Sequence, residues 1–162
     1  MRTSLLTLAL FGLAAVATPA TAQVSFSPTV GYDLDNPFGD GLSVGLAFEL
    51  STQLSSLPLE PAIRPSVEYV FVDADDVTFV RANADLIGRL NPVSGGTLLP
   101  YAKAGLTLEY VDAEFIPDGF DSSDTEISLN LGGGVEVSRF FVEGELGLGG
   151  YSDVRLRAGY RF

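Results

Sequence analysis

Alternation of apolar and polar residues is the dominant pattern of the chain after residue 22. The last segment shows it clearly: apolar Val154, Leu156, Tyr160 and Phe162 lie on one face, and Arg155, Arg157 and Arg161 lie on the other. A period of two predicts a strand whose two faces meet different surroundings. The pattern recurs, with Phe79 as an exception, and predicts eight strands over residues 24–32, 42–50, 63–71, 78–89, 101–110, 127–137, 139–148 and 154–162.

Residues 1–22 follow another pattern. A single basic residue, Arg2, precedes an apolar run from Leu5 to Ala17, and Ala20-Thr21-Ala22 closes the segment. This order is typical of a secretory signal peptide, and the run is shorter than the ~20 residues of a membrane-spanning helix. We therefore expect a signal peptide over 1–22 and a single β-barrel domain over 23–162.

Eight strands of about ten residues are long enough to cross a bilayer when tilted, and closure into a barrel removes unpaired edges. The polar face is mostly Ser, Gly, Thr, Ala and Asn, which suits a narrow interior better than a solvent surface. The prediction is an all-β fold, an eight-stranded antiparallel transmembrane up-and-down β-barrel. The alternative is a soluble periplasmic lipocalin-like barrel that binds an apolar ligand.

Aromatic residues support the membrane interpretation because they gather near both strand ends, as at the two interfaces of a bilayer. One predicted girdle is Tyr32, Tyr69, Phe71 and Tyr110, and the other is Phe26, Phe140, Tyr160 and Phe162.

Charges on the polar face predict an ion-pair network in the lumen. A hairpin centred on Gly150 places Glu145 opposite Arg155 and Glu143 opposite Arg157. Paired charge is tolerated in a confined interior, whereas unpaired charge is costly. The predicted network comprises Glu143, Glu145, Arg155, Arg157, Arg64, Glu68, Arg81, Asp85, Lys103 and Glu109, and Glu49, Arg89 and Arg161 extend it. Because these carboxylates have basic partners, we expect no catalytic pair among them.

Composition excludes several functions. The net charge of −12 and the pI of about 4.1 argue against a nucleic-acid partner, which needs a basic patch. The chain has no His and no Cys, so Ser-His triads, His-ligated metals and disulfides are excluded. We expect no cofactor.

Acidic residues concentrate in the four connections at one end of the predicted barrel. They are Asp33, Asp35, Asp40, Asp73, Asp75, Asp76, Asp112, Glu114, Asp118, Asp121, Asp124 and Asp153. One interpretation is a solvated face. The other is a rim that binds divalent cations, alone or shared with lipopolysaccharide phosphates, with Asp118, Asp121 and Asp124 as a weak candidate site beside Phe115 and Phe120.

Three segments, "PYAKAGLTL", "LNLGGGVEV" and "LRAGYRF", make the chain resemble the small bacterial outer-membrane β-barrel family of the OmpA/OmpX type (porin-family proteins). The resemblance implies that Val154, Leu156, Tyr160 and Phe162 form the C-terminal signal read by the barrel assembly machinery. Pro28 and Pro65 depart from an ideal strand, and we expect a bulge or a local gap there.

The resemblance also implies a location and a role. The location is a Gram-negative outer membrane, with lipid and lipopolysaccharide as partners, extracellular acidic loops and periplasmic termini. The role is structural or surface-interacting, without an open diffusive pore, because side chains fill an eight-stranded interior. Small-barrel lipid A enzymes rely on a His that this chain lacks, so we expect no enzyme.

Overall fold

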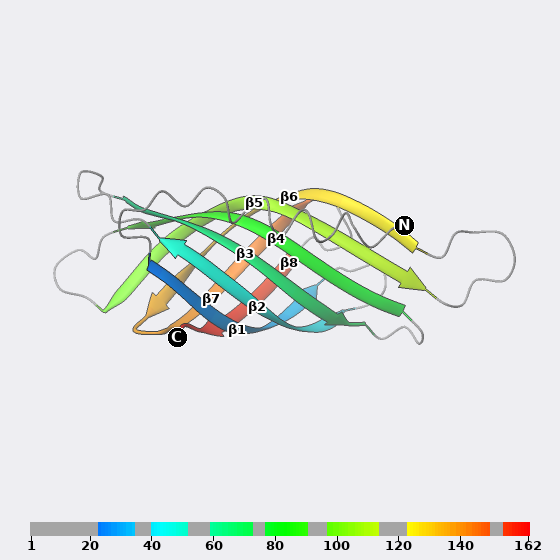
Figure 1. Ribbon diagram of the computed structural model, residues 1–162, viewed down its shortest axis with the longest axis horizontal. Helices are drawn as coiled ribbons and strands as arrows, with labels where there is room; N and C mark the ends of the chain where they lie inside the picture. The colour runs from blue at the N-terminus through cyan, green and yellow to red at the C-terminus, as the bar shows by residue number, and fades with distance from the viewer. Residues whose placement is uncertain are drawn as a thin grey trace, which may run out of the picture.

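The computed structural model describes residues 23–34, 40–51, 59–72, 77–90, 97–113, 123–149 and 154–162. They form one closed antiparallel barrel in which each strand pairs with its sequence neighbours and the last pairs with the first (Figure 1). The strands are β1 (Gln23–Leu34), β2 (Gly41–Ser51), β3 (Leu59–Phe71), β4 (Val77–Leu90), β5 (Leu98–Ala113), β6 (Ser123–Val137), β7 (Phe140–Leu148) and β8 (Val154–Tyr160). The predicted all-β, eight-stranded barrel is confirmed.

The predicted signal peptide lies outside the described residues. Within the described ranges, the structure has no helix long and apolar enough to span a membrane.

The barrel has two different ends. The turn end holds Gln23, the Ser138–Arg139 turn and Phe162, and it lies on the left in Figure 1. Ser138 takes a positive φ of 60°, which lets two residues join β6 to β7. The loop end, on the right, is where β1, β3, β5 and β7 finish.

The strands are strongly staggered. Following cross-strand partners once round the barrel from Val24 leads back to β1 at Leu34, ten positions further along. The path runs through Leu50, Ile63, Leu86, Ala104, Leu131, Leu146 and Val154. A stagger of this size requires strands that tilt from the barrel axis, as membrane-spanning strands do.

Two prolines interrupt single ladders without shifting the register. Between β2 and β3, the pairs opposite Arg64 and Pro65 are missing, and the register is the same on both sides. Between β1 and β8, regular pairing ends at Thr29, next to Pro28, and Phe162 N then bonds to Phe26 O at 2.9 Å. The expected local gaps are present, and neither is a bulge.

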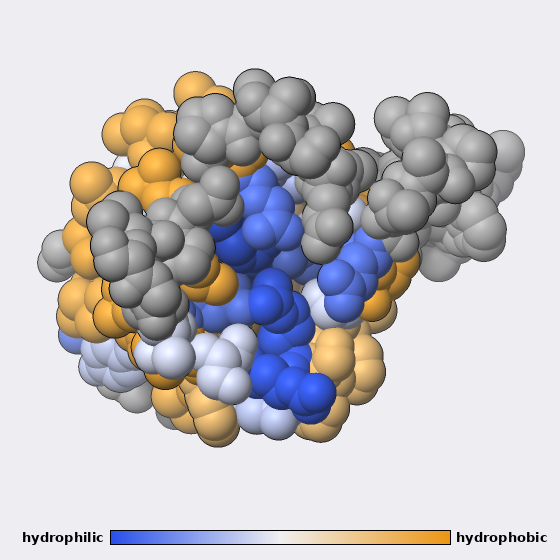
Figure 2. Space-filling view, turned by 90° about the vertical axis from the view of Figure 1, so that its left-hand side faces the viewer, coloured by the Kyte–Doolittle hydropathy of each residue, from blue (hydrophilic) through white to orange (hydrophobic). Residues whose placement is uncertain are grey.

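The two faces of the sheet have the predicted polarity. Outward positions of all eight strands carry exposed apolar side chains, such as Ile127 at 70% exposure, while inward positions carry buried polar and charged ones. Figure 2 looks into the turn end and shows hydrophilic residues in the middle with hydrophobic residues around them. This polarity is opposite to that of the lipocalin-like alternative, which needs an apolar interior.

Inward positions include two apolar clusters. Val70, Phe79 and Val111 are register partners on β3, β4 and β5, and they pack together near the loop end. Phe79 therefore breaks the alternation because it fills the lumen. The second cluster, nearer the turn end, comprises Ala62, Ile87, Tyr101 and Phe141.

Candidate functional site: the charged lumen

Arg81 organises the loop-end part of the lumen. Its guanidinium lies 3.0 Å from Asp33 Oδ2, 3.3 Å from Glu68 Oε2 and 3.1 Å from Glu109 Oε1. Arg81 has no solvent exposure. Its guanidinium also lies over the Phe79 ring, 5.2 Å from the centroid, so the apolar cluster covers this group of charges.

Arg157 and Lys103 pair with the carboxylates at the centre of the lumen. Arg157 Nε lies 2.9 Å from Glu143 Oε1, and the Arg157 guanidinium also contacts Glu68 and Glu145. Lys103 Nζ lies 2.9 Å from Glu143 Oε1 and 3.1 Å from Asp85 Oδ2. Each cation therefore faces several carboxylates, and no pair stands alone.

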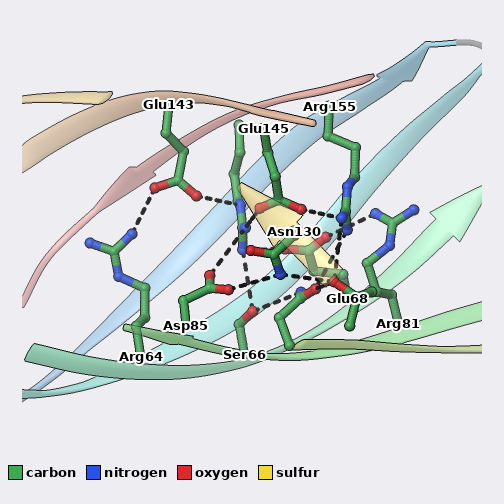
Figure 3. A network of polar contacts seen from close by, with 12 residues as sticks. Arg64, Ser66, Glu68, Arg81, Asp85, Asn130, Glu143, Glu145 and Arg155 are labelled. Carbon is green, nitrogen blue, oxygen red and sulfur yellow. Dashed lines mark hydrogen bonds and ion pairs between the residues drawn. The ribbon is translucent and has the colours of Figure 1, made fainter. Parts of the chain in front are cut away.

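Neutral side chains bind the same central groups. The Asn130 amide donates to Asp85 Oδ1 at 3.0 Å and to Thr107 Oγ1 at 2.9 Å, and the Thr107 hydroxyl donates to Asn83 Oδ1 at 2.9 Å. Arg155 forms an ion pair with Glu145 and donates to Asn83 and Thr107. Figure 3 shows Asn130 between Asp85 and the Glu145–Arg155 pair.

Four residues close the turn-end part of the network. Arg89 contacts Glu49 and lies 3.1 Å from Glu136 Oε2 through its Nε, and Arg161 pairs with the same two carboxylates. Arg64 connects this group to the centre, because its guanidinium lies 3.1 Å from Glu49 Oε2 and 2.8 Å from Glu143 Oε2.

Arg64 is also held by aromatic rings. Its guanidinium lies 4.7 Å from the Phe141 centroid and 5.4 Å from that of Tyr101, whose hydroxyl donates to Glu143 at 2.6 Å. Rings and carboxylates together fix the orientation of the guanidinium.

The ion pairs form one connected network from end to end. A continuous path passes through Asp33, Arg81, Glu68, Arg157, Glu143, Arg64, Glu49, Arg89 and Glu136. Seven of the nine Lys and Arg residues of the chain take part. The lumen is thus filled by charges that neutralise one another.

Glycine makes room for these side chains where strands approach closely. A Cβ at Gly105 would lie 2.4 Å from Asp85 Oδ1, and one at Gly45 would lie 2.6 Å from Glu68 Cγ. Any larger residue at these inward positions would displace a network carboxylate.

The structure places all ten predicted network residues, together with Glu49, Arg89 and Arg161, inside the barrel. Glu143 lies opposite Arg157 and Glu145 opposite Arg155, in the register expected from the hairpin. We did not predict Glu136 or Tyr101 as members, although both were on the polar face.

One acidic residue was assigned to the wrong place. We expected Asp33 in the exposed rim, but it is 1% exposed and bonded to Arg81. β1 continues to Leu34, so Asp33 keeps the inward parity of Thr29 and Gly31. That parity was the signal that would have identified it.

Only some of the other residues predicted for the acidic rim are among the described residues. Asp40 and Asp124 are exposed, and Asp112 is half-buried and accepts a hydrogen bond from Tyr110 at 3.2 Å. The described residues contain no cluster of three potential metal ligands. Asp118 and Asp121 lie outside those residues, as do Asp35, Asp73, Asp75, Asp76, Glu114, Phe115, Phe120 and Asp153, so the divalent site stays a prediction.

The predicted C-terminal signal lies on the outer face. Leu156 and Phe162 are exposed, whereas Val154 and Tyr160 are half-buried. The Phe162 ring stacks on Phe26 at 4.9 Å and meets Tyr160 edge-on at 4.8 Å. Aromatic side chains therefore bridge β1 and the end of the chain at the point where Pro28 interrupts the ladder.

Comparisons with known proteins concern the fold. No protein-family model and no curated protein matches the chain. The N-terminal β-barrel domain of Pseudomonas aeruginosa OprF matches with a TM-score of 0.56 and 19% identity, over 88% of this chain and 100% of that domain. Neisserial surface protein A matches with a TM-score of 0.56 and 17% identity, over 88% and 98%.

The outer membrane enzyme PagL matches with a TM-score of 0.52 and 14% identity, over 85% of this chain and 98% of that chain. At these identities the likeness concerns architecture alone. The chain has the closed eight-stranded barrel fold of small bacterial outer-membrane proteins.

Proposed function

We propose that the protein is a small integral protein of a Gram-negative outer membrane, with a structural or surface-interaction role. The observation that carries this proposal is the polarity of the barrel, with exposed apolar side chains on all eight strands and charges buried inside. In water that outer surface would be unfavourable, because soluble monomers rarely expose large contiguous apolar patches. In a bilayer it is the surface that lipid requires.

We further propose that the barrel has no open diffusive pore. The ion-pair network runs the length of the lumen, and Val70, Phe79 and Val111 cover its loop-end part. Moving an ion through would require separating buried pairs, which is costly when a partner is left unpaired.

The same contacts support a non-catalytic role. Each buried carboxylate of the network has at least one guanidinium or ammonium partner. A general acid or base needs a carboxyl group that can exchange a proton with substrate, and these groups are occupied. The likeness to PagL extends to the fold alone.

The expected partners are outer-membrane lipid and lipopolysaccharide, and the barrel assembly machinery during insertion. The proposed orientation places the loop end outside the cell and the turn end in the periplasm. The segments that join strands at the loop end are rich in Asp, which suits a surface that faces water.

The test is to refold residues 23–162 in parallel in detergent micelles and in plain buffer. In micelles we expect β circular dichroism and a gel band that migrates differently before and after boiling. A folded, monodisperse form without detergent would contradict the membrane proposal.

The closed lumen has a separate test. Protein reconstituted in a planar bilayer should give no steady conductance, with an open porin as the positive control. Steady single-channel steps from the folded protein would contradict the closed lumen and leave the membrane location unaffected.

A further inference from the structure

A cavity of about 440 Å³ opens at the turn end of the barrel, at the hydrophilic centre seen in Figure 2. We call it the vestibule. Its charged lining consists of Glu49, Glu60, Arg89, Arg139 and Arg161, and most other lining residues are polar. Small-molecule sites commonly have volumes of about 300–1,000 Å³, so the vestibule is large enough for a ligand.

The floor of the vestibule is charge-balanced. Arg89 is 3% exposed and pairs with Glu49 and Glu136, and Arg161 pairs with the same two carboxylates. Two cations therefore face two anions, and the floor attracts neither sign of charge strongly.

Two charged residues at the mouth of the vestibule, unlike those of its floor, have no partner of opposite charge among the described residues. Glu60 and Arg139 line the vestibule, and neither has an ion-pair or hydrogen-bond partner for its side chain among the described residues. Glu60 lies near the start of β3, whereas Arg139 lies in the turn between β6 and β7. In the order of an eight-stranded barrel these are nearly opposite sides of the mouth.

We propose that the vestibule binds a zwitterionic ligand, namely a short peptide with free termini. The Arg139 guanidinium holds the carboxylate, for which its planar fork is suited, and the Glu60 carboxylate holds the ammonium group. An extended tripeptide measures about 10 Å from end to end, so its two charged termini are far enough apart to meet two separate side chains. A ligand of single charge would satisfy only one of the two groups.

The experiment uses residues 23–162 folded in a non-ionic detergent, because a zwitterionic detergent would compete. The probe is trialanine, titrated by calorimetry at millimolar concentration. Three blocked forms separate the two contacts: N-acetyl-trialanine, trialanine amide and the doubly blocked peptide. Glu60→Gln and Arg139→Gln remove the mouth charges singly, and Asp40→Asn removes a charge at the loop end as the matched control.

We expect saturable binding of trialanine, weakened about tenfold or more by either mouth substitution and unchanged by Asp40→Asn. N-acetyl-trialanine should become insensitive to Glu60→Gln, and trialanine amide insensitive to Arg139→Gln. Each variant is first shown to be folded by its heat-dependent gel mobility. Absence of saturable trialanine binding, equal binding of the doubly blocked peptide, or equal weakening by Asp40→Asn would each overturn the proposal.

Discussion

Glu143 and Arg157 face each other across the β7–β8 ladder, and Arg157 Nε lies 2.9 Å from Glu143 Oε1. Both residues also have other partners: Glu143 contacts Arg64 and Lys103, and Arg157 contacts Glu68. The pair is thus a junction within the network.

Reversing one charge of this junction should destabilise the barrel. Arg157→Glu places a new carboxylate beside three others, those of Glu68, Glu143 and Glu145, and we expect a loss on the order of 3–5 kcal/mol in the free energy of unfolding. Adding Glu143→Arg should recover only part of it, because Lys103 and Arg64 then face a cation. Urea unfolding in lipid vesicles measures the double-mutant cycle, and strictly additive changes would contradict the coupling.

The two faces of β6 can be tested at adjacent positions. Leu129 is 55% exposed on the outer face and Ser128 is buried in the lumen. Leu129→Arg should cost about 2–4 kcal/mol or block insertion. The chain has no cysteine, so Leu129→Cys and Ser128→Cys report access directly. A lipid-soluble thiol reagent should modify the first much faster, and the opposite order would mean that the faces are reversed.

Asp33 should matter far more than the loop acids. Asp33→Asn weakens a charge-assisted contact to the fully buried Arg81, and we expect a loss of about 1–3 kcal/mol in unfolding free energy. Asp40→Asn, which changes an exposed carboxylate, should stay within about 0.5 kcal/mol. Equal losses of unfolding free energy for Asp33→Asn and Asp40→Asn in urea would indicate that Asp33 belongs to the solvated rim.

The aromatic contact at the chain end should stabilise the β1–β8 seam. Phe162→Ala removes a ring that stacks on Phe26 and meets Tyr160 edge-on, and aromatic pairs are each worth about 0.5–1.5 kcal/mol beyond area burial. The temperature at which the folded gel band disappears should fall. Leu156→Ala, on the same outer face, is the control, and an equal fall there would assign the effect to general packing.

Calcium distinguishes the two interpretations of the acidic loops. If the loops bind divalent cations, millimolar calcium should raise thermal stability in detergent, because oxygen ligands and dense like charge favour it. Asp121→Asn combined with Asp124→Asn should reduce the rise. A rise no larger than that given by sodium chloride of matched ionic strength would leave only a solvated face.

Much of the barrel could be predicted from parity. Leu129 and Asn130 were assigned to the correct faces because a period of two has only two solutions, and the small polar residues of one face suit a narrow interior better than a solvent surface. The hairpin register followed equally directly, because a short connection fixes which residues of β7 and β8 are opposite.

The contacts that could not be predicted from the sequence are those between side chains that meet across the lumen. Arg64 meets Glu143 and Arg157 meets Glu68 although these partners lie 79 and 89 positions apart. Such contacts depend on strand stagger and side-chain reach, which a linear pattern does not contain. Val70 was missed for another reason: an apolar residue has the same hydropathy whether it faces lipid or fills the lumen.

The end-to-end network has a consequence for how the chain enters a membrane. Some of its pairs join strands that are not neighbours, such as Asp33 with Arg81 and Glu136 with Arg89, so an open sheet would carry these carboxylates into hydrocarbon without the cations that neutralise them. Each such group costs several kcal/mol in that medium. Insertion before closure is therefore disfavoured, and the charges reach the bilayer interior only as the ring completes. Crossing the membrane and closing the barrel are then a single cooperative event.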